Sequence, residues 1–521
     1  MTANLARILD WNRYRHDDRT ALIYEEQEWT YAELDDEVNA IAAGLRSIGL
    51  GEGDILALVA RNSPAYLITT LAVAKIGGVF LPLNTGLHRR DFEYLLGHAG
   101  AVAVATEEEF FGVVSSICAE LPEVRRILSL SPDVPDGWVG YHRLLEDHAG
   151  ERVETVDRDD DDLQRILYTS GTTSRPKGAM ITHGNCNANM DAQVVELGLT
   201  RHDRILNFAP LYHVGGLDIP GFGTWYVGAT MILLRKFDAR RILEVVSRER
   251  ITGMVMVATM VHLIRKLEDR KDFDTDSVKW LIFSQVPESL YHETREVFAK
   301  ARLIEGYGMT ETCNGVSYLD EEHMLSKTGS VGRPMPRVDI RVVDESGAPV
   351  PVGELGEIVM RGPTVGPGYW RDPAATAAAH RNGWFHSGDV GRFDEDGYLY
   401  VIDRLKDMIR SGGENIASSE IEEAIYQHPA VYEAAVIGVP HPKWVETPKA
   451  YVVLHKGMEL TSDQLAAHCR EHLAGFKMPR YVEFLDELPR NPTGKVLKTV
   501  LKEQDQKTRN DPAGGSSGPM R

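Results

Sequence analysis

Apolar runs alternate with helical segments through the first hundred residues, and this alternation limits the possible folds more than any other feature. Residues 54–60 and 101–105 are apolar runs of the kind found in strands buried on both faces. Thr30 and Glu33 are spaced as a capping box at the start of one helix, and residues 65–75 form a second helical segment. Strands that alternate with helices predict an α/β fold with doubly wound, mostly parallel sheets.

The pattern recurs beyond residue 200 and then changes. Strand-like runs at 206–210, 231–234 and 280–283 predict a second α/β series. Between about 325 and 402, short strands alternate with Gly, Pro and Asp turns, which indicates a β-rich subdomain. A compact α+β unit follows the charged segment 403–407.

A chain of 521 residues exceeds what one hydrophobic core usually supports, so we expect more than one domain. We place the boundary in the charged segment, since the compact α+β unit begins after it. The expected organisation is a large N-terminal domain of residues 1–403 and a small α+β C-terminal domain of residues 404–503. Residues 504–521 are polar and then rich in Gly, Ser and Pro, so we expect a disordered tail there.

Composition excludes some classes of function. The net charge of −20 argues against nucleic-acid binding, which needs a basic surface. No apolar run approaches the length of a membrane span, and the N-terminus lacks a signal peptide's apolar region, so we expect a cytoplasmic protein without an integral membrane segment. The cysteines have no CxxC spacing and are predicted to be free thiols: Cys118, Cys186, Cys313 and Cys469.

Residues 166–178 predict a phosphate-binding loop. An apolar strand end runs into six small or hydroxyl residues and then into Pro176, Lys177 and Gly178. Such a loop presents backbone N–H groups, hydroxyls and a cation together, which suits a polyphosphate. The spacing is not that of the Walker motif, and a solvated surface turn is the plainer interpretation. The length of the small-residue run argues against that turn.

Four further motifs follow in order, at residues 305–311, 383–389, 403–416 and 489–495. Each alone has an ordinary structural explanation, but the ordered set with the phosphate loop is specific. Over residues 10–503 the sequence resembles the adenylate-forming superfamily of acyl-CoA synthetases, firefly luciferases and nonribosomal-peptide adenylation domains.

The resemblance implies a large N-terminal domain, a small mobile C-terminal domain and two half-reactions. A carboxylate attacks the α-phosphate of Mg·ATP to give an acyl-adenylate and pyrophosphate, and a thiol such as that of CoA then displaces AMP. The expected cofactors and co-substrates are therefore ATP, Mg²⁺ and CoA.

By this resemblance the nucleotide is held by residues of several motifs. Glu311 is the expected Mg²⁺ ligand, Thr310 the α-phosphate contact, and Tyr307 the residue that stacks on adenine between glycines that leave room for a planar ligand. Asp389 and Arg404 are expected at the ribose. The remaining residues are the phosphate-binding set Thr169, Ser170, Gly171, Thr172, Thr173 and Lys177, and the adenine-lining set Ser284, Gln285 and Gly308.

Catalysis and domain movement are also implied by the resemblance. Lys495 would bridge the attacking carboxylate and the ATP oxygens, because without it two anions approach uncompensated. Lys406 would be the hinge, and rotation about it would withdraw Lys495 and bring a thiol-tunnel segment into place. That CoA tunnel segment is Gly412, Gly413 and Glu414.

The acyl pocket is expected around residues 212–217, 284–286 and 308–316. Amino-acid-activating relatives carry an Asp where this chain has Tyr212-His213, so a plain carboxylic acid is favoured, with Asp218 as the reservation. Glycines in this region hint at a long or bulky apolar acid. The candidate pocket residues are Tyr212, His213, Gly215, Gly216, Val286, Gly308, Met309 and Cys313, with His213 also a catalytic candidate.

Two departures from the family pattern stand out. Ser174 replaces a glycine common in the phosphate loop, and Ser284-Gln285 replaces a Gly-Gly pair beside the adenine and acyl sites. Gln285 fills space or offers an amide to the substrate, or is a neutral loop substitution; both interpretations stay open.

Four functions are compatible with these motifs. The first is a carboxylic acid–CoA ligase for a medium- or long-chain, aromatic or bulky acid. The second is an acyl-AMP ligase that loads an acyl carrier protein. A luciferase-like monooxygenase and a non-catalytic nucleotide-binding regulator complete the set. The regulator is disfavoured because the charged residues expected of the enzyme are all present: Lys177, Glu311, Asp389 and Lys495.

Overall fold

A computed structural model of the chain describes residues 3–169, 175–284, 286, 288–411, 414–490 and 496–510. The chain divides into two compact units, each made of two segments. Unit 1 comprises Met1–Ile340 and Met360–Phe385, and unit 2 comprises Arg341–Val359 and His386–Arg521. This division falls at residues other than the single boundary expected near 403.

The first sheet of unit 1 confirms the strand–helix alternation read at the start of the chain. Its central strands are parallel, and the last pair, β8 and β9, is antiparallel. Within the described residues its strands, in spatial order, are β7 (Val139–Gly140), β6 (Arg126–Ser129), β5 (Ala103–Thr106), β3 (Ile55–Val59), β4 (Val79–Pro82), β8 (Leu163–Thr169) and β9 (Lys177–Thr182).

The second sheet of unit 1 is parallel from β14 through β13, β12, β10 and β11 to β1, with antiparallel pairs at both ends. In the described part of the chain its order is β16 (Arg333–Pro334), β15 (Asn314–Leu319), β14 (Arg302–Met309), β13 (Trp280–Phe283), β12 (Gly253–Val255), β10 (Arg204–Asn207), β11 (Thr230–Leu233), β1 (Thr20–Tyr24) and β2 (Gln27–Thr30).

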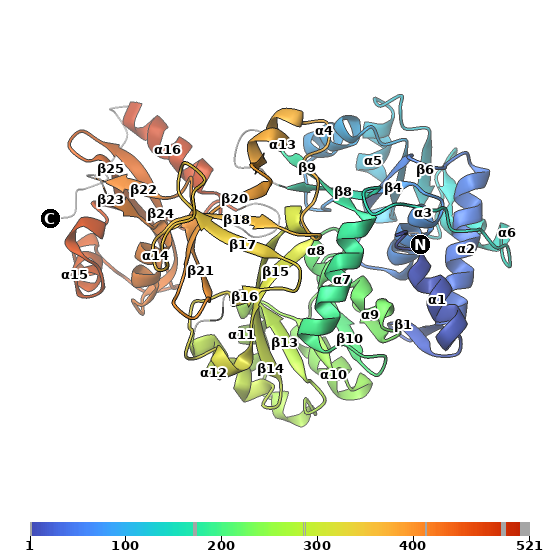
Figure 1. The fold of residues 1–521 in the computed structure, drawn as a ribbon, viewed down its shortest axis with the longest axis horizontal. Coiled ribbons are helices and arrows are strands. Elements are labelled where there is room, and N and C mark those ends of the chain that lie inside the picture. The colour runs from blue at the N-terminus through green and yellow to red at the C-terminus, as the bar shows by residue number, and fades with distance from the viewer. Residues whose placement is uncertain are drawn as a thin grey trace. The chain divides into compact units, whose positions relative to one another are not determined.

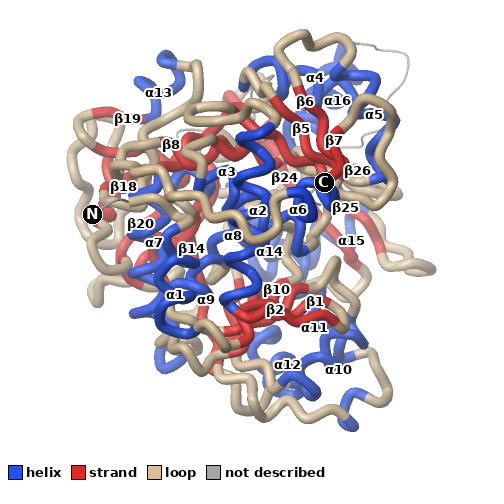
Figure 2. The backbone as a smooth tube through the Cα atoms, turned by 90° about the vertical axis from the view of Figure 1, so that its right-hand side faces the viewer, coloured by secondary structure: helices blue, strands red, loops and turns tan. Residues whose placement is uncertain are grey.

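Helices cover both sheets, and three of them, α10 to α12, gather beside the second one in two views (Figures 1 and 2). The capping box predicted at Thr30 and Glu33 is present at the start of α2. The helices of unit 1 are α1 (Arg7–His16), α2 (Tyr31–Ser47), α3 (Pro64–Lys75), α4 (Arg89–Ala99), α5 (Phe111–Cys118), α6 (Tyr141–Asp147), α7 (His183–Leu197), α8 (Val214–Asp218), α9 (Phe222–Tyr226), α10 (Ala239–Glu249), α11 (Ala258–Arg265), α12 (Glu288–Val297) and α13 (Pro373–Ala379).

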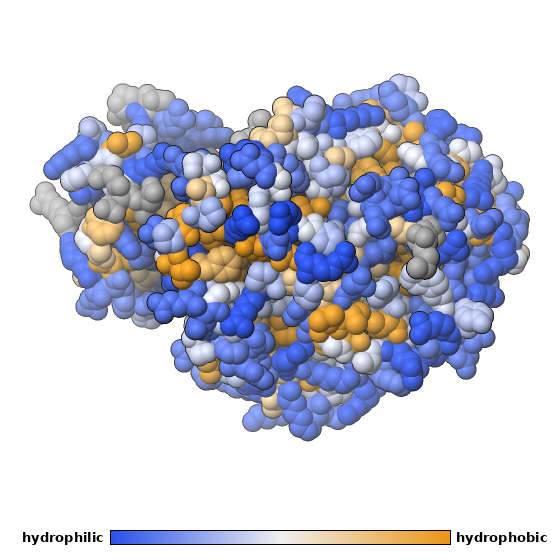
Figure 3. All heavy atoms as spheres, in the orientation of Figure 1, coloured by the Kyte–Doolittle hydropathy of each residue, from blue (hydrophilic) through white to orange (hydrophobic). Residues whose placement is uncertain are grey.

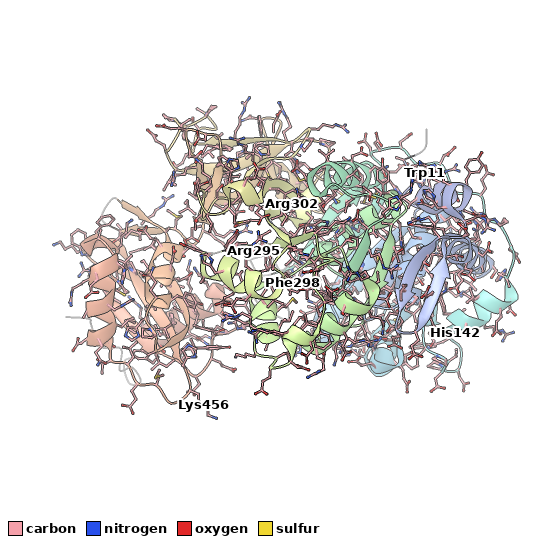
Figure 4. The ribbon with its side chains drawn as sticks, turned by 90° about the horizontal axis from the view of Figure 1, so that it is seen from below. Trp11, His142, Arg295, Phe298, Arg302 and Lys456 are labelled. Carbon is pink, nitrogen blue, oxygen red and sulfur yellow. The ribbon has the colours of Figure 1, made fainter. Side chains whose placement is uncertain are left out.

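Long polar side chains join these layers at several points. Arg302, labelled in Figure 4, begins β14 and donates to the carbonyls of Glu196 and Leu197 at 3.2 Å, which satisfies the C-terminal end of α7. The apolar core of this region includes the large buried side chains Trp225, Tyr31 and Tyr66. Helix α7 is thereby held against β14, the strand that contains most of the 305–311 motif.

The predicted β-rich region is a third sheet built from short strands and turns. Its described strands are β17 (Asp339–Val343), β18 (Gly356–Arg361), β20 (Trp384–Phe393) and β19 (His380–Arg381), with β21 (Leu399–Arg404) paired to β20. The α/β fold with a β-rich subdomain and a small C-terminal α+β part is confirmed.

The C-terminal part of unit 2 has its own core around Ile409, Ile421 and Val436. Its described strands are β23 (Glu414–Ile416), β22 (Ile409–Ser411), β25 (Val445–Leu454), β24 (Val431–His441) and β26 (Tyr481–Phe484), and its helices are α14 (Ser418–Tyr426), α15 (Ser462–His472) and α16 (Lys498–Asn510).

The expectation of a disordered tail from residue 504 was wrong at its start. Helix α16 continues to Asn510, because Asp505 is buried and its carboxylate accepts from Lys449 Nζ at 2.8 Å. Arg509, one turn later, pairs with the same carboxylate at 2.6 Å. Residues 511–521 lie outside the described part of the chain.

The face shown in Figure 3 is mostly hydrophilic, with hydrophobic residues in smaller areas between hydrophilic ones. Among the described residues, no helix combines the length and apolarity that a membrane crossing requires. The four cysteines are free, as expected, and all four are buried.

Candidate active site

The loop predicted to bind phosphate lies between β8 and β9, which pair as an antiparallel hairpin. In the register of β8 and β9, Thr169 is paired with Lys177, and the Thr169 hydroxyl donates to the Lys177 carbonyl at 3.4 Å. The two ends of the loop therefore face each other at the edge of the first sheet. The predicted phosphate contacts between them, Ser170, Gly171, Thr172 and Thr173, lie outside the described residues, as does Ser174.

Lys177 and Glu311 are brought together by a third residue, Tyr369. The Lys177 ammonium lies 5.2 Å from the centroid of the Tyr369 ring. The Tyr369 hydroxyl donates to Glu311 Oε1 at 2.9 Å. Lys177, expected at the pyrophosphate, thus contacts the ring of Tyr369, and Glu311, expected at the metal, contacts its hydroxyl. Sequence reasoning missed Tyr369, which lies in a Gly/Pro-rich stretch that no motif singled out.

Backbone pairing explains the position of Tyr369. Residues 368–370 run antiparallel to β9, with a bridge between Ala179 and Tyr369. The N–H of Trp370 donates to the Gly178 carbonyl at 2.8 Å, one residue from Lys177. Segment 366–370 is therefore an extra strand-like edge that fixes Tyr369 against the phosphate hairpin.

Thr310 and Glu311 occupy a single 3₁₀ turn between β14 and β15. The Thr312 hydroxyl donates to the Asn314 carbonyl at 2.7 Å, and the Met309 N–H donates to that hydroxyl at 3.1 Å. The N–H of Gly366 donates to the Glu311 carbonyl at 2.8 Å. The turn is held from both sides, so the Glu311 carboxylate is presented by a rigid backbone.

The reason proposed for the glycines beside Tyr307 was wrong. A Cβ at Gly308 would overlap the carbonyl oxygen of Asn314, and one at Gly306 would lie 2.6 Å from the Tyr318 ring. These glycines are required by the close approach of β14 and β15, whose register shifts between Tyr307 and Gly308. They give no evidence about a planar ligand, and stacking of Tyr307 on adenine stays a prediction.

Glu305, the first residue of the same motif, holds the segment expected at adenine. Its carboxylate is buried and accepts the Val286 N–H at 3.1 Å. Val286 is buried, whereas Ser284 is exposed, and Gln285 between them lies outside the described residues. Sequence reasoning gave Glu305 no role, although a carboxylate at the end of a buried strand is a signal of a specific partner.

The Tyr212-His213 pair lies at the start of α8. The His213 ring accepts the Gly215 N–H through Nδ1 at 3.1 Å. Although the ring keeps an exposed face, desolvation by the surrounding protein lowers the pKa of His213 below its usual range, so it is neutral at neutral pH. Nδ1 is thereby the acceptor nitrogen, and Nε2 carries the proton.

Only part of the glycine content near His213 creates space. A Cβ at Gly216 would collide with the backbone of Ala209 and Pro210, and Gly221 has a φ of 42°. Gly215 and Gly223, by contrast, have ordinary room for a Cβ. Two of the four glycines that suggested a bulky acid are therefore explained by the backbone instead.

Asp218, the residue that left an amino-acid substrate open, forms a buried ion pair. Arg165 Nη2 donates to both carboxylate oxygens, at 2.5 and 2.6 Å, and neither side chain has appreciable exposure. Burial raises the pKa of Asp218, and the guanidinium opposes that rise. The same guanidinium lies 3.2 Å from Cys186 Sγ and 3.6 Å from Cys313 Sγ. Cys313 was assigned to the acyl pocket, but its sulfur faces this ion pair.

In unit 2 the predicted ribose pair is close together. Asp389 and Arg404 are opposite each other on β20 and β21, and Arg404 Nε contacts Asp389 Oδ1 at 2.7 Å. Asp389 is buried and its own N–H donates to the Ser387 hydroxyl at 3.0 Å. A carboxylate held in this way is an acceptor of fixed orientation for hydroxyl donors.

Lys406 lies in a turn between β21 and β22. Its carbonyl accepts from Lys502 Nζ at 3.1 Å. Just before it, Asp403 Oδ2 accepts the Ser418 N–H and hydroxyl, both at 2.6 Å, at the start of α14. Glu414 begins β23, whereas Gly412, Gly413 and Lys495 lie outside the described residues.

Comparison with known proteins shows the family of the chain. The sequence model described as "AMP-binding enzyme" matches residues 9–370, and that described as "AMP-binding enzyme C-terminal domain" matches residues 420–495. The chain belongs to the AMP-binding enzyme family. The resemblance to adenylate-forming enzymes of the acyl-CoA synthetase type is thereby confirmed.

Individual relatives of this AMP-binding enzyme match over nearly its whole length. A feruloyl-CoA synthase of Amycolatopsis sp is 41% identical over 469 residues, 90% of this chain and 92% of that protein. A long-chain-fatty-acid–CoA ligase of Mycobacterium tuberculosis is 34% identical over 481 residues, 91% and 93% of the two chains. Its kinship with these ligases makes this AMP-binding enzyme an acyl-CoA synthetase, an AMP-forming acid–thiol ligase.

One solved structure also bears on the cofactors. The O-succinylbenzoate coenzyme A synthetase from Bacillus subtilis, in complex with ATP and magnesium ion, aligns with a TM-score of 0.83 and 31% identity, over 95% of this chain and 99% of that one. In the AMP-binding enzyme described here, Glu311 offers a hard carboxylate oxygen, and the Lys177 cation contacts the same tyrosine, Tyr369. This donor chemistry fits magnesium, which prefers oxygen ligands next to phosphate.

Proposed function

We propose that this acyl-CoA synthetase activates a hydrophobic carboxylic acid, medium- or long-chain, aromatic or otherwise bulky, and transfers it to CoA. The observation that favours a plain carboxylic acid over an amino acid is the Arg165–Asp218 pair. Because both oxygens of Asp218 accept from one buried guanidinium, this carboxylate is not available to an ammonium group of the substrate. The names of the relatives, which refer to feruloyl and long-chain fatty acids, support the same class.

The adenylation step assigns one task to each described residue. Lys177 at the end of the phosphate hairpin holds the β- and γ-phosphates that leave as pyrophosphate. Thr310 donates to the α-phosphate, and Glu311 holds magnesium, which when bound neutralises the charge of the phosphate oxygens. The chemistry is positioning and charge neutralisation, because in-line attack at phosphorus needs little else.

Residues of unit 2 complete the proposal. Asp389 accepts the ribose hydroxyls, oriented by Arg404 at 2.7 Å. Lys495 bridges the attacking carboxylate and the α-phosphate, and rotation at Lys406 exchanges it for the segment 412–414 that lines the thiol tunnel. The acyl group then passes from adenylate to the CoA sulfur, and AMP leaves.

The test is pyrophosphate release over a panel of acids, with the thioester product identified by mass spectrometry. Ferulic acid and a long-chain fatty acid represent the hydrophobic class, and phenylalanine is the matched amino-acid control. We expect release with at least one hydrophobic acid and none with phenylalanine. Each reaction is run with CoA and with a phosphopantetheinylated carrier protein.

Three results would overturn parts of the proposal. Activity with phenylalanine alone would contradict the substrate class. Transfer to the carrier protein but not to CoA would contradict the acceptor. Release of orthophosphate in place of pyrophosphate would contradict the adenylation mechanism.

A further inference from the structure

Tyr369 contacts both charged residues that the proposed adenylation step uses on the phosphate side. Its hydroxyl donates to Glu311 Oε1 at 2.9 Å, and its ring lies 5.2 Å from Lys177 Nζ. These three residues come from the segment before α13, the turn after β14 and the start of β9. Such a convergence of three chain segments on one aromatic side chain requires a reason beyond packing.

The hydroxyl decides how the Glu311 carboxylate is turned. A carboxylate on a flexible side chain can rotate about its last bond, and a hydrogen bond to one oxygen removes that freedom. Here the bond engages Oε1, so Oε2 is the oxygen left to a metal ligand role. Partners of this kind, one step removed from the metal, orient the ligand atoms and affect metal affinity strongly.

The ring contact with Lys177 adds to the effect. A cation over the face of an aromatic ring is attracted by its negative face. The same positive charge stabilises electron density drawn into the ring, so it makes the phenol a stronger donor toward Glu311. The lysine side chain is in turn held near the end of the hairpin where the phosphates are expected.

The backbone around Tyr369 makes this arrangement rigid. Its N–H donates to the Thr376 hydroxyl at 2.9 Å, and that hydroxyl donates to the Asp372 carbonyl at 2.9 Å. The next N–H, that of Trp370, donates to the Gly178 carbonyl at 2.8 Å. The phenol is therefore placed by the same hairpin that places Lys177.

We infer that Tyr369 is a positioning residue for adenylation, whose hydroxyl orients Glu311 toward magnesium and whose ring holds Lys177 toward the β- and γ-phosphates. The inference rests on the proposed function, because it takes Glu311 as the magnesium ligand. It assigns Tyr369 no contact with the reacting atoms. Its effect is to fix the spacing between the metal and the lysine before ATP binds.

The test separates the hydroxyl from the ring. Tyr369→Phe keeps the ring beside Lys177 and removes only the donor to Glu311. We expect the Mg²⁺ concentration for half-maximal pyrophosphate release to rise about 10- to 100-fold, as for other residues that orient metal ligands. The rate at saturating Mg²⁺ and the KM for the acid stay within about threefold of wild type, since neither depends on that hydroxyl.

A direct binding measurement accompanies the kinetics. Mn²⁺ binding to the enzyme with a non-hydrolysable ATP analogue, followed by electron paramagnetic resonance, weakens by the same factor in Tyr369→Phe. The matched control is Tyr400→Phe, which removes a hydroxyl that lies 3.4 Å from Asp394 in a surface turn. The control leaves both metal measurements unchanged.

The outcomes distinguish this inference from the proposed function. If Glu311→Gln raises the Mg²⁺ requirement and Tyr369→Phe leaves it within twofold of wild type, the inference is wrong and the function stands. If Glu311→Gln also leaves it unchanged, the metal assignment itself is wrong. Should Tyr369→Phe not fold, 3-fluorotyrosine at position 369 is the second variant. Its more acidic phenol lowers the Mg²⁺ requirement, and an unchanged requirement overturns the inference equally.

Discussion

His183 makes the stability of unit 1 depend on pH. It begins α7, and its Nδ1 accepts the Leu5 N–H at 3.0 Å. Its Nε2 is buried and has no hydrogen-bond partner among the described residues. Burial, reinforced by the charge of Arg158, lowers the pKa of His183 to about 3. His183→Asn keeps an acceptor toward Leu5 and removes the titrating group.

The direction and size of the effect follow from the two pKa values. The unfolded chain takes up a proton near pH 6.5, whereas the folded chain does so only near pH 3. The stabilisation is complete above pH 6.5 and is lost as the pH falls toward 3. Between pH 8 and pH 5 the wild type should lose about 2 kcal/mol through this group, at about 1.4 kcal/mol per pKa unit.

The measurement is urea unfolding followed by tryptophan fluorescence at pH 8 and pH 5, for wild type and His183→Asn. Other histidines with lowered pKa, such as His98 and His213, act alike in both proteins and cancel in the difference. The wild type should lose about 2 kcal/mol more than the variant. Equal losses within about 0.5 kcal/mol would refute the reasoning.

Three further predictions concern single residues. Asp218→Asn leaves Arg165 buried without its counter-charge and should lower the free energy of unfolding by about 3–5 kcal/mol. The double variant Arg165→Met with Asp218→Leu should recover most of that loss. Urea unfolding measures both, and a loss under about 1 kcal/mol in Asp218→Asn contradicts the prediction. Gly308→Ala should unfold at a lower temperature by several degrees, because its Cβ overlaps the Asn314 carbonyl; an unchanged melting temperature contradicts the β14–β15 geometry. Lys495→Ala should abolish pyrophosphate release while it spares thioester formation from supplied acyl-AMP, and equal loss of both half-reactions excludes the assigned role.

Local sequence patterns predicted much of the fold correctly. The apolar run at 54–60 is β3, and the hydroxyl–carboxylate spacing at Thr30 and Glu33 is a capping box, because both depend on neighbours in sequence. The end of the chain was misread for the opposite reason. Helix α16 is polar along its sequence, and Asp505 within it is ordered by Lys449, 56 residues away. Such distant pairs leave no local signal.

The residues of the candidate site likewise divide into those that sequence patterns predicted and those that they could not. Asp389 and Arg404 could be paired from their motifs, since adjacent strands of a hairpin bring them together. Tyr369 could not, because a tyrosine in a Gly/Pro-rich stretch has no pattern that indicates its hydrogen bond to Glu311. Gly308 was noticed but explained wrongly, since only the facing strand shows that its backbone leaves no space for a Cβ.

The contact between Asp403 and Ser418 has a consequence for timing. Asp403 precedes Lys406 and Ser418 follows it, so the two hydrogen bonds at 2.6 Å close a loop of chain across the proposed hinge. A rotation at Lys406 that separates the two flanks must break both bonds and form them again in each turnover. Bonds to a charged acceptor contribute about 1.5–3 kcal/mol each. The strength of the Asp403–Ser418 hydrogen bonds would then set the rate at which the enzyme passes from the first half-reaction to the second.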